Sequence, residues 1–551
     1  MSAKSIYLGG RSPEEIPSSV DVSGVETLDE LRYGIAKLFS IADSKSLSFH
    51  GESGLLSTID EIRQTTTKIG VRVDSHLIRE PLSPPEIPLV GSYFEIHPDH
   101  IGNHDRLFRR YGSVIKTVNM GTTVYFTNDP RVSEIVLGEN EFFTKKTSNS
   151  NHPLFWMNDN TALFTCDTAA PAFKMAHRFV PPSMSTKAAK HYVPTLQRAA
   201  EASFAVFDEL DDRKQAWHTY QYMFKLGGQI VCKVILGQDV GHFDTVDTHP
   251  HEIIRLMGEY LALMKQTSLS PPWFKYLPFS SSRRLSIVQE RLWALIDQAA
   301  AAWPLPDAPD LPIAQAALES TCIADYLKRA IDDAGQKLPH KYLLSNIVSL
   351  LGAGLTTSSS MLSLLLYALT KYPGIQERIL QELIDHDVTQ DTKWTYDNLM
   401  NLPFLDRFVK ESLRLHGPAF QTARNTKKDV IVPGGWLIPA DSVVIPTFPS
   451  IHRHQDYWDN PDRFDPDRWL AADVKKHRLA YTPFAAGPRG CVGFNIAHVE
   501  ARLVLALLVL RYEICDVSKE PMMYDPEFLV VRPINSYVRA VRRTSWPDKG
   551  A

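Results

Sequence analysis

A single cysteine lies in a setting that suits metal chemistry. Cys491 follows Gly490 and comes just before the apolar segment Phe494 to Leu510, whose composition predicts a helix. A thiolate at the N-terminus of a helix is stabilised by the positive end of the helix dipole and by free N–H groups. We therefore expect a lowered pKa for the Cys491 thiol and a role for Cys491 as a metal ligand.

The residues around Cys491 have the defined spacing F-x-x-G-x-R-x-C-x-G. Gly487 and Gly493 allow the backbone to turn tightly around the sulfur. Phe484 can shield the sulfur from water, and Arg489 can pair with an anionic group beside the metal. This spacing favours a haem iron that Cys491 holds through its thiolate.

Two other interpretations of this loop stay open. A glycine-rich loop before a helix can bind phosphate, although no Lys-Ser or Lys-Thr pair follows these glycines. A lone cysteine can also be an ordinary buried core residue. Burial in the core is the simplest interpretation of the remaining cysteines, which are Cys166, Cys232, Cys322 and Cys515.

The composition argues against several classes of function. The chain of 551 residues has 59 Lys and Arg against 63 Asp and Glu, a net charge of −4, which disfavours nucleic-acid binding. Its five scattered cysteines indicate a reducing compartment. No signal-peptide core is visible, and no uninterrupted apolar run reaches the roughly 20 residues of a spanning helix. We expect a soluble, cytoplasmic protein without a transmembrane anchor, and peripheral membrane contact stays open.

A glutamate and two arginines accompany the cysteine loop. Glu411 and Arg414 are three residues apart in a predicted helix and share one face, which by itself indicates only a surface ion pair. Arg468 follows in a loop that Pro461 and Pro466 stiffen. In this order, and together with the cysteine loop, these residues resemble the cytochrome P-450 superfamily over residues 80–543.

The resemblance implies a mainly α haem-thiolate fold with a minor β region. Glu411, Arg414 and Arg468 would form the buried network that fixes the core around the haem. The cofactor would be haem b, with Cys491 as the iron ligand. The sequence agrees with such a fold, because it is mostly helical in character from Pro130 onward, with an interruption at Pro271 and Pro272.

The segment Lys341 to Tyr372 resembles the long family helix that crosses the distal face of the haem. Within it, residues 352–357 fall where the family has A/G-G-x-D/E-T-T/S. Gly354 would help to make room for dioxygen, and Thr356, followed by Thr357, would deliver protons. Leu355 then occupies the position of the family's acid and borders the substrate pocket.

The segment Ala162 to Arg178 resembles the part of the family that covers a haem propionate. By this likeness Phe164 stands over the iron in the substrate pocket, and Phe173 replaces the family's tryptophan. The residues that would reach the propionates are Lys145, His177 and Arg424. The nearest likeness is to the soluble, bacterial-type fatty-acid hydroxylases and their fungal relatives. A predicted hairpin offers Tyr125 to the substrate pocket, but no arginine for a fatty-acid carboxylate.

The first 78 residues are predicted to form a separate small α+β domain. The order of two strands, a helix, a strand, a short helix and a strand resembles the ubiquitin-like β-grasp. A proline-rich linker over residues 79–90 then leads to the catalytic domain at residues 91–551. We expect residues 5–73 to dock a partner or a second copy of the chain, because they offer a surface but no evident chemistry.

The resemblance implies a haem-thiolate monooxygenase that inserts oxygen from O2 into an apolar, medium-sized molecule, such as a secondary metabolite, a terpenoid or a fatty-acid-like compound. Electrons would come from a separate NADPH-dependent reductase or another donor. Because Leu355 is not an acid, a peroxide-using or rearranging enzyme stays open. A haem-binding sensor without turnover is a further alternative.

Overall fold

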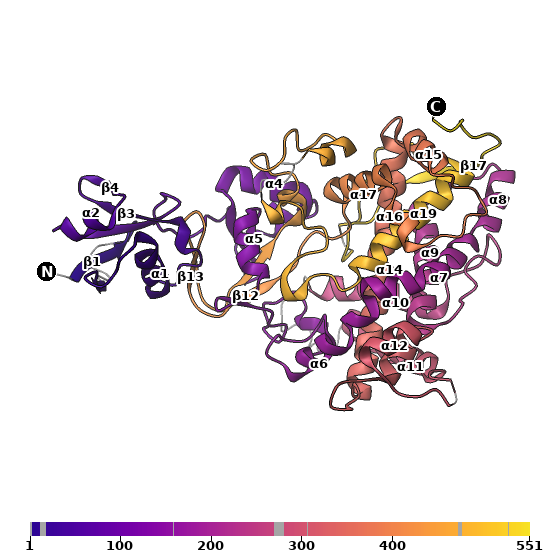
Figure 1. Ribbon diagram of the computed structural model, residues 1–551, viewed down its shortest axis with the longest axis horizontal. Helices are drawn as coiled ribbons and strands as arrows, with labels where there is room; N and C mark the ends of the chain where they lie inside the picture. The colour runs from indigo at the N-terminus through magenta and orange to yellow at the C-terminus, as the bar shows by residue number, and fades with distance from the viewer. Residues whose placement is uncertain are drawn as a thin grey trace.

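The computed structural model describes residues 3–11, 18–157, 159–268, 280–305, 307–471, 477–526 and 528–550. A small N-terminal unit lies at one end of the molecule, beside a large body that is mainly helical (Figure 1). The predicted mainly α architecture with a minor β region is confirmed. The predicted interruption at Pro271 and Pro272 lies outside the described residues.

The N-terminal unit is a mixed sheet with two helices. Its elements are β1 (Ala3–Leu8), β2 (Ser18–Asp21), α1 (Leu28–Leu38), β3 (Leu47–Gly51), β4 (Gly54–Leu56), α2 (Ile59–Gln64) and β5 (Ile69–Val73). The sheet order is β2-β1-β5-β3-β4, with β1 and β5 parallel. Thr58 and Glu61 form a capping box that begins α2. The predicted order of elements is present, and the likeness to a β-grasp stays a prediction.

The N-terminal unit packs directly against the catalytic body. Ile431 of the body is buried in the same apolar cluster as Ile35 and Phe49 of the unit. Its backbone N–H donates to Ser40 O at 3.0 Å, and Ala42 N–H donates to Ile431 O at 2.9 Å. The unit therefore shares a core with the strand that carries Ile431, which lies beside α1 in Figure 1.

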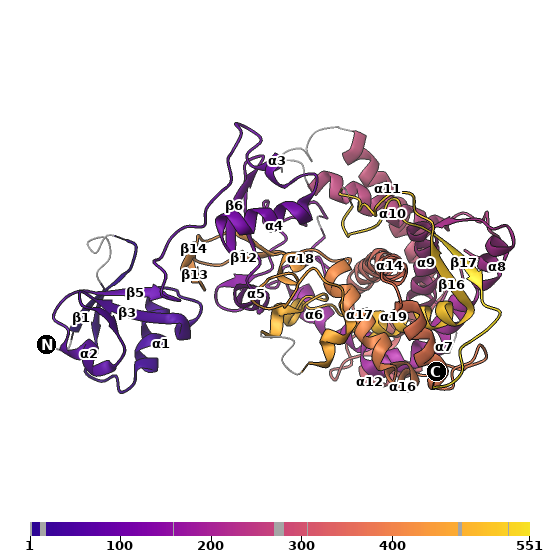
Figure 2. The ribbon, with the colours of Figure 1, turned by 90° about the horizontal axis from the view of Figure 1, so that it is seen from above.

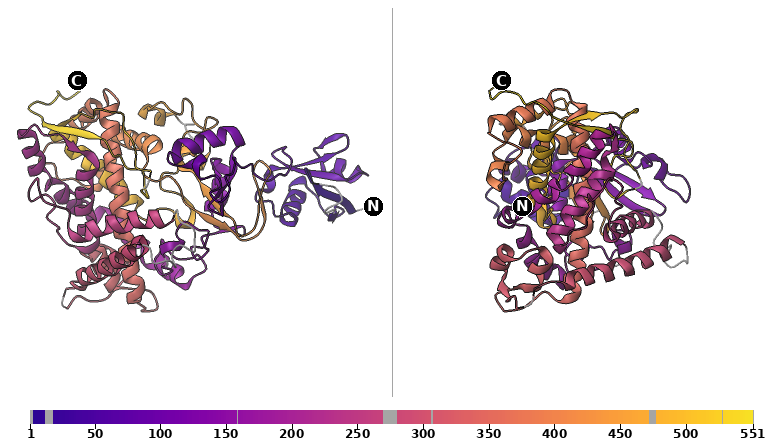
Figure 3. Two further views of the ribbon diagram at one scale, coloured as in Figure 1. Left: turned by 180° about the vertical axis from the view of Figure 1, so that it is seen from behind. Right: turned by 90° about the vertical axis from the view of Figure 1, so that its right-hand side faces the viewer.

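Helices make up most of the catalytic body. They are α3 (Tyr93–Ile96), α4 (His100–Tyr111), α5 (Pro130–Leu137), α6 (Pro171–Phe179), α7 (Thr186–Glu201), α8 (Phe204–Asp212), α9 (Thr219–Leu236), α10 (Glu252–Ser268), α11 (Ser280–Ala301), α12 (Ile313–Glu319), α13 (Ile323–Arg329), α14 (His340–Lys371), α15 (Ile375–Asp385), α16 (Tyr396–Met400), α17 (Pro403–His416), α18 (Phe448–Ile451) and α19 (Phe494–Arg511). The helices gather at the end of the molecule away from the N-terminal unit (Figure 3).

The catalytic body also contains several short sheets. The strands are β6 (Val114–Asn119), β7 (Thr122–Thr127), β8 (Phe143–Thr144), β9 (Trp217–His218), β10 (Leu311–Pro312), β11 (Ala330–Ile331), β12 (Arg424–Thr426), β13 (Val430–Val432), β14 (Trp436–Ile438), β15 (Val443–Pro446), β16 (Tyr512–Asp516) and β17 (Tyr537–Arg542). The largest of these sheets has the order β6-β7-β15-β12-β8. The hairpin β13-β14 contacts the N-terminal unit and the start of the linker, at Ile41 and Arg79. The strand β17 lies at the end of the molecule away from the N-terminal unit (Figure 1).

The helix α14 is the core of the body, and it confirms the predicted central helix. Figure 2 looks nearly along its axis and shows α9, α10, α17 and α19 around it. Most of its apolar side chains are buried. Within the described part of the chain, α14 alone is long and apolar enough to cross a membrane, and 72% of that stretch is buried inside the protein.

Candidate active site at the Cys491 loop

The Cys491 loop is held in place by backbone contacts that require glycine. Gly487 has φ +72°, and a Cβ there would lie 2.1 Å from Leu137 O, so no other residue fits without movement. The Cys491 N–H donates to Phe484 O at 2.9 Å. Cys491 itself is exposed, whereas Cys166, Cys232 and Cys322 are buried. The loop therefore presents one thiol to a neighbouring group.

The pKa of the Cys491 thiol differs from the sequence prediction. Although Cys491 is exposed, the protein packed around its thiol removes part of the water near the sulfur; this raises the pKa above the ordinary value, and the N–H groups of Gly493 and Phe494 lower it by less. The helix N-terminus is present as predicted, because α19 begins at Phe494. The prediction of a lowered pKa is wrong for the isolated thiol, since removal from water disfavours the thiolate more than the helix dipole favours it. A bound metal would reverse this balance.

Glu411, Arg414 and Arg468 form a buried, fully bonded network. Arg414 and Glu411 are both 0% exposed and pair at 2.9 Å, and Arg468 Nε donates to the same carboxylate at 2.9 Å. Trp469 Nε1 and Asp465 N also donate to Glu411. Arg414 further donates to the carbonyls of His452, Pro461 and Arg463. Because every charge has partners, the network fixes one geometry of α17 against the loop before Cys491.

Three cations gather around one buried carboxylate beside the cysteine loop. Arg424 Nε lies 2.8 Å from Glu139 Oε1, and Arg489 Nε lies 3.6 Å from the same oxygen. Lys145 donates to the carbonyl of Phe164 and lies 4.2 Å above the Phe164 ring. Burial and the two arginines hold the pKa of Lys145 well below its ordinary value. Burial also lowers the pKa of Arg424, to about 10.

This cluster fits the propionates of a haem. Arg424 and Arg489 share the single carboxylate of Glu139, and Lys145 adds a third basic side chain, so basic groups outnumber acidic ones in this cluster. Arg424 Nη2 is buried and has no hydrogen-bond partner among the described residues. Unpaired buried charge is costly, so the cluster is suited to an anion with two carboxylates. An exposed thiol on the adjacent loop completes the set of groups that haem requires.

The segment at α6 reaches the same cluster through an aromatic contact. The Arg489 guanidinium stacks on the Phe173 ring, 3.7 Å from its centre, where the family resemblance places a tryptophan. Arg489 also donates to the carbonyls of Leu163 and Cys166. His177 lies one turn further along α6, is exposed, and has its ring 5.3 Å from that of Phe173. Phe173 thus positions Arg489, and His177 lies at the edge of the cluster.

One face of α14 turns toward these groups. Asn346 accepts from the N–H of Leu163, whose carbonyl in turn accepts from Arg489. At helical spacing from Asn346, Ala353 and Thr357 share its face; Ala353 is exposed and Thr357 is half-buried, whereas Leu355 and Thr356 between them are buried. We call Ala353 and Thr357, with the neighbouring Phe164, the distal face. That this face lies across a haem from the cysteine loop stays a prediction from the family resemblance.

The cytochrome P450 family model matches residues 81–539 of the chain. The chain belongs to the cytochrome P450 family. It is 48% identical to cytochrome P450 monooxygenase alnD of Emericella nidulans, with the whole of both chains covered. It is 30% identical over 290 residues to leukotriene-B4 omega-hydroxylase 3 of Mus musculus, which covers 51% of this chain and 55% of that one.

The fold of this P450 also has a counterpart among solved structures. The crystal structure of the cytochrome P450DA heme domain matches with a TM-score of 0.75 at 22% identity, over 85% of this chain and 99% of that one. The protein is therefore an oxidoreductase of the P450 monooxygenase type, with haem as its cofactor. The predicted family, fold and class of enzyme are confirmed.

The structure corrects the predicted assignment of residues in the distal helix of this P450. Leu355 is 0% exposed and belongs to the main core cluster, and its backbone lies against Gly227 of α9. Thr356 is also buried, with its hydroxyl bonded to Gly352 O at 2.9 Å. The residue on the distal face is Thr357, which donates to Ala353 O at 2.5 Å. Leu355 therefore does not border the substrate pocket.

A shift of one residue brings the family pattern into agreement with the structure. The pattern A/G-G-x-D/E-T-T/S also fits residues 353–358, with Gly354 second, Thr356 at the acid position and Thr357 at the conserved threonine. Gly354 lies against Val231 of α9, where a Cβ would come within 2.7 Å of a Val231 methyl carbon. Small size at this position thus serves the packing of α14 on α9. The repeated glycines and threonines of this segment explain why sequence alone left the alignment ambiguous.

A buried glutamate that the sequence analysis missed lies beneath the distal face. Ser358 Oγ donates at 2.5 Å to Glu500 of α19, and Glu500 is 3% exposed. Burial raises the pKa of Glu500 to about 7, while the Ser358 bond lowers it by less. The signal in the sequence was the single acidic residue of a mainly apolar helix, nine positions after Cys491.

Tyr125 does not join the other predicted site residues. It is buried in a separate apolar cluster with Val132, Val432 and Trp436, on the side of the sheet near the N-terminal unit. Burial raises the pKa of its hydroxyl. The strand alternates its side chains, so Val124 and Phe126 belong to a different cluster. The prediction that Tyr125 lines the substrate pocket is wrong, because it faces the other side of β7.

Proposed function

We propose that this P450 inserts one oxygen atom of O2 into an apolar, medium-sized organic substrate, using haem b and electrons from a separate NADPH-dependent reductase. The observation that carries the proposal is the exposed Cys491 thiol beside the buried cluster of Lys145, Arg424 and Arg489. When bound there, haem supplies the oxygen-activating chemistry. The protein's own residues then bind the cofactor, orient the substrate and supply protons.

Cys491 holds the iron, and the three cations hold the propionates. Phe484 packs edge-on against Phe494, with ring centres 5.1 Å apart, and shields the thiolate from water. Ala353 and Phe164 border the substrate, because both are exposed toward the distal face. An apolar substrate suits such a boundary, which offers few hydrogen bonds. A secondary metabolite or a fatty-acid-like chain is the class we favour, since relatives include the alnD monooxygenase and a leukotriene-B4 omega-hydroxylase.

Proton supply runs through Thr357, Ser358 and Glu500. The position before Thr357 in α14, where the family pattern has an acid, is occupied by Thr356. The helix therefore supplies no carboxylate at that position. Glu500 has a raised pKa of about 7 and therefore holds a proton near neutral pH. Ser358 bonds to it and is the next residue after Thr357, whose hydroxyl lies on the distal face. Glu500 would thus replace the missing acid from the side of α19.

The electron donor would approach the side of the Cys491 loop away from α14. A surface concavity of about 500 Å³ borders the loop and is lined by Lys410, Phe484, Cys491 and His498 among others. A short path to the thiolate makes this the natural place for a donor to dock. Comparing product formation with a reductase and with hydrogen peroxide tests this proposal.

The reductase comparison also tests the second candidate function. A peroxide-using or rearranging enzyme is favoured by the absence of an acid next to Thr357 in α14. We expect product with reductase and NADPH and little product with peroxide alone. The reverse result would support the second candidate.

The ligand assignment has a spectroscopic test that does not depend on turnover. We expect the reduced, carbon monoxide-bound protein to show the red-shifted Soret band of thiolate-ligated haem. Cys491→Ser should lose that band, and Cys515→Ser should keep it. A band typical of histidine ligation in the unaltered protein would overturn the proposed function.

A further inference from the structure

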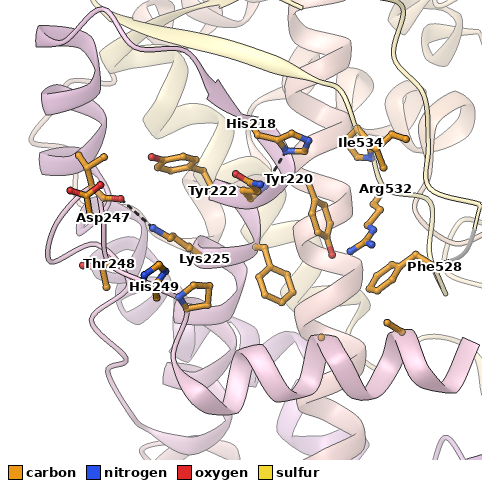
Figure 4. Close-up of a pocket in the computed structure, with 17 residues that line it drawn as sticks. His218, Tyr220, Tyr222, Lys225, Asp247, Thr248, His249, Phe528, Arg532 and Ile534 are labelled. Atoms are coloured by element: carbon orange, nitrogen blue, oxygen red, sulfur yellow. Dashed lines mark hydrogen bonds between the residues drawn. The ribbon is translucent and has the colours of Figure 1, made fainter. Parts of the chain in front are cut away.

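A second cavity lies away from the Cys491 loop. It has a volume of about 700 Å³ and lies between the start of α9, the segment before α10, α10 itself and residues 528–534 near the C-terminus (Figure 4). This volume is in the range of small-molecule sites in proteins. None of its lining residues takes part in the site described above.

Aromatic side chains line the walls of this cavity, and small residues form its floor. Tyr220 and Phe224 of α9 and Phe528 of the C-terminal segment line it, and the Tyr220 ring lies 5.8 Å from the Phe224 ring and 6.4 Å, edge-on, from the Phe528 ring. Gly258 and Ala262 of α10 form the floor one helical turn apart. A Cβ on Gly258 would lie 3.1 Å from the Phe224 ring, so the small residue leaves room for the aromatic wall. Such a space suits a flat, apolar body.

One end of the cavity carries a cation with spare hydrogen-bonding capacity. Lys225 lines the cavity with its ammonium group turned toward the Val246–Asp247 segment, and among the described residues its one hydrogen bond as a donor goes to Val246 O, at the long distance of 3.5 Å. Burial lowers the pKa of Lys225, and the nearby Asp247 raises it by less. An ammonium group has three donors, so a ligand carboxylate could accept the others.

The cation at the other end of the cavity, Arg532, already has partners in the protein. Arg532 Nε donates to Asp525 at 3.0 Å, which neutralises its charge. Its guanidinium stacks 3.8 Å from the centre of the Phe528 ring and 5.1 Å from that of Tyr220. Arg532 thus contacts the aromatic rings of both Tyr220 and Phe528. Lys225 is therefore the cation that can bind a ligand anion.

We propose that this cavity is a second ligand-binding site, which takes a flat, apolar or aromatic molecule with one carboxylate. The carboxylate binds Lys225, and the apolar body lies against the aromatic wall of Tyr220, Phe224 and Phe528, above Ala262. The site is independent of the proposed oxidation chemistry, since it needs neither the haem nor an electron donor.

The C-terminal segment connects this site to the distal side. Val531 lies between Phe528 and Arg532, and its N–H donates to Pro418 O at 2.8 Å. Its side chain packs with Phe420 and with Leu364 of α14. Leu364 lies at helical spacing from Thr357 and so belongs to the same side of α14 as the distal face. A ligand that contacts Phe528 therefore contacts a segment that also borders the distal side. We expect binding in this cavity to change the affinity of ligands for the haem site.

Equilibrium dialysis of the haem-loaded, full-length protein tests the site. The probe is 2-naphthoate, the neutral comparison is 2-naphthylmethanol, and 4-phenylimidazole is present at saturation to occupy the haem iron. We expect one 2-naphthoate to bind under these conditions, more tightly than 2-naphthylmethanol. Equal binding of the two probes, or no binding of either, would overturn the proposal.

Variants locate the bound probe. Lys225→Met should weaken 2-naphthoate binding at least about tenfold, whereas Lys233→Met, on the same helix but outside the cavity, should not change it. Ala262→Trp should fill the cavity and abolish binding. Unchanged binding in Lys225→Met, with its Soret spectrum intact, would refute the site even if Ala262→Trp failed to fold.

A spectral titration tests the coupling. Added 2-naphthoate should shift the apparent Kd of 4-phenylimidazole for the haem iron at least about threefold, and Lys225→Met should remove that shift. An identical titration with and without 2-naphthoate would overturn the coupling to the distal side.

Discussion

Thr357 and Thr356 are neighbours in the sequence but have different surroundings. Thr357 is on the distal face, and Thr356 is buried in α14 with its hydroxyl on Gly352 O. We expect Thr357→Ala to reduce product formation about tenfold or more and to divert electrons to hydrogen peroxide, because it removes a hydroxyl from the proton path. Product and peroxide assays with a reductase would measure both effects.

Thr356→Ala is the matched control for that experiment. It removes an internal hydrogen bond of the helix and should leave the ratio of product to peroxide close to that of the unaltered protein. Equal uncoupling in both variants would contradict the assignment of Thr357.

The raised pKa of Glu500 predicts that the stability of the protein depends on pH. Its pKa is about 7 in the folded protein against an ordinary value of 4.5, so the folded state binds more protons between these pH values. The contribution of Glu500 to the free energy of unfolding is therefore greatest below pH 4.5 and falls as pH rises to 7, by a total on the order of 3 kcal/mol.

Glu500→Gln should remove that part of the pH dependence. The measurement is chemical denaturation between pH 5 and 7.5, and we expect the unaltered protein to lose stability relative to the variant as pH rises. Glu513→Gln, at an exposed position of β16, is the control and should keep the original slope. A constant difference between Glu500→Gln and the unaltered protein would contradict a raised pKa.

At the scale of elements, α17 is joined to the loop before the cysteine by the Glu411 network. Arg414→Ala would leave the 0% exposed Glu411 with part of its charge uncompensated. We expect a loss of about 3 to 5 kcal/mol in unfolding free energy and poor haem retention, read from the ratio of Soret to protein absorbance.

An exposed ion pair nearby offers the comparison. Arg378 pairs with Asp467 at 2.9 Å, with side chains 47% and 42% exposed. Arg378→Ala should cost only about 0 to 1 kcal/mol, because water screens the pair. Similar losses in both variants would mean that burial does not set the strength of the Glu411 network.

At the scale of the whole molecule, one carboxylate joins the N-terminal unit to the catalytic body. Asp74 accepts from Arg131 at 2.9 Å and from the N–H of Gly434 at 2.9 Å. Arg79 follows and stacks 4.1 Å from the Trp436 ring. We expect Asp74→Asn to loosen this junction and to speed trypsin cleavage after Arg79 several-fold, measured by mass spectrometry. Asp60→Asn, in an exposed pair of α2, should leave the rate unchanged.

The docking of a partner through residues 5–73 stays a proposal. Exposed apolar side chains remain on the unit, among them Tyr33, Leu38 and Leu55. The structure adds that part of the unit is already covered by the body, since Ile431 is buried in its core. Deleting residues 1–79 would thus expose Ile431, so point substitutions at Tyr33 and Leu55 give a cleaner test of docking.

The sequence by itself determined the proximal side of the site and most of the helices. The spacing around Cys491 and the order of Glu411, Arg414 and Arg468 are enough to identify the proximal side, because each motif is short and contains rare residue types. The bounds of α14 and α19 follow from long apolar segments with clear ends. These features depend on local pattern, which a sequence records directly.

Only the tertiary structure decided which residues face the haem side. Thr356 and Thr357 are alike in the sequence, and a rotation of 100° around the helix separates a buried residue from one on the distal face. Tyr125 lies on the opposite side of its strand for the same reason. The raised pKa values of Cys491 and Glu500 depend on removal from water, which results from packing between distant segments.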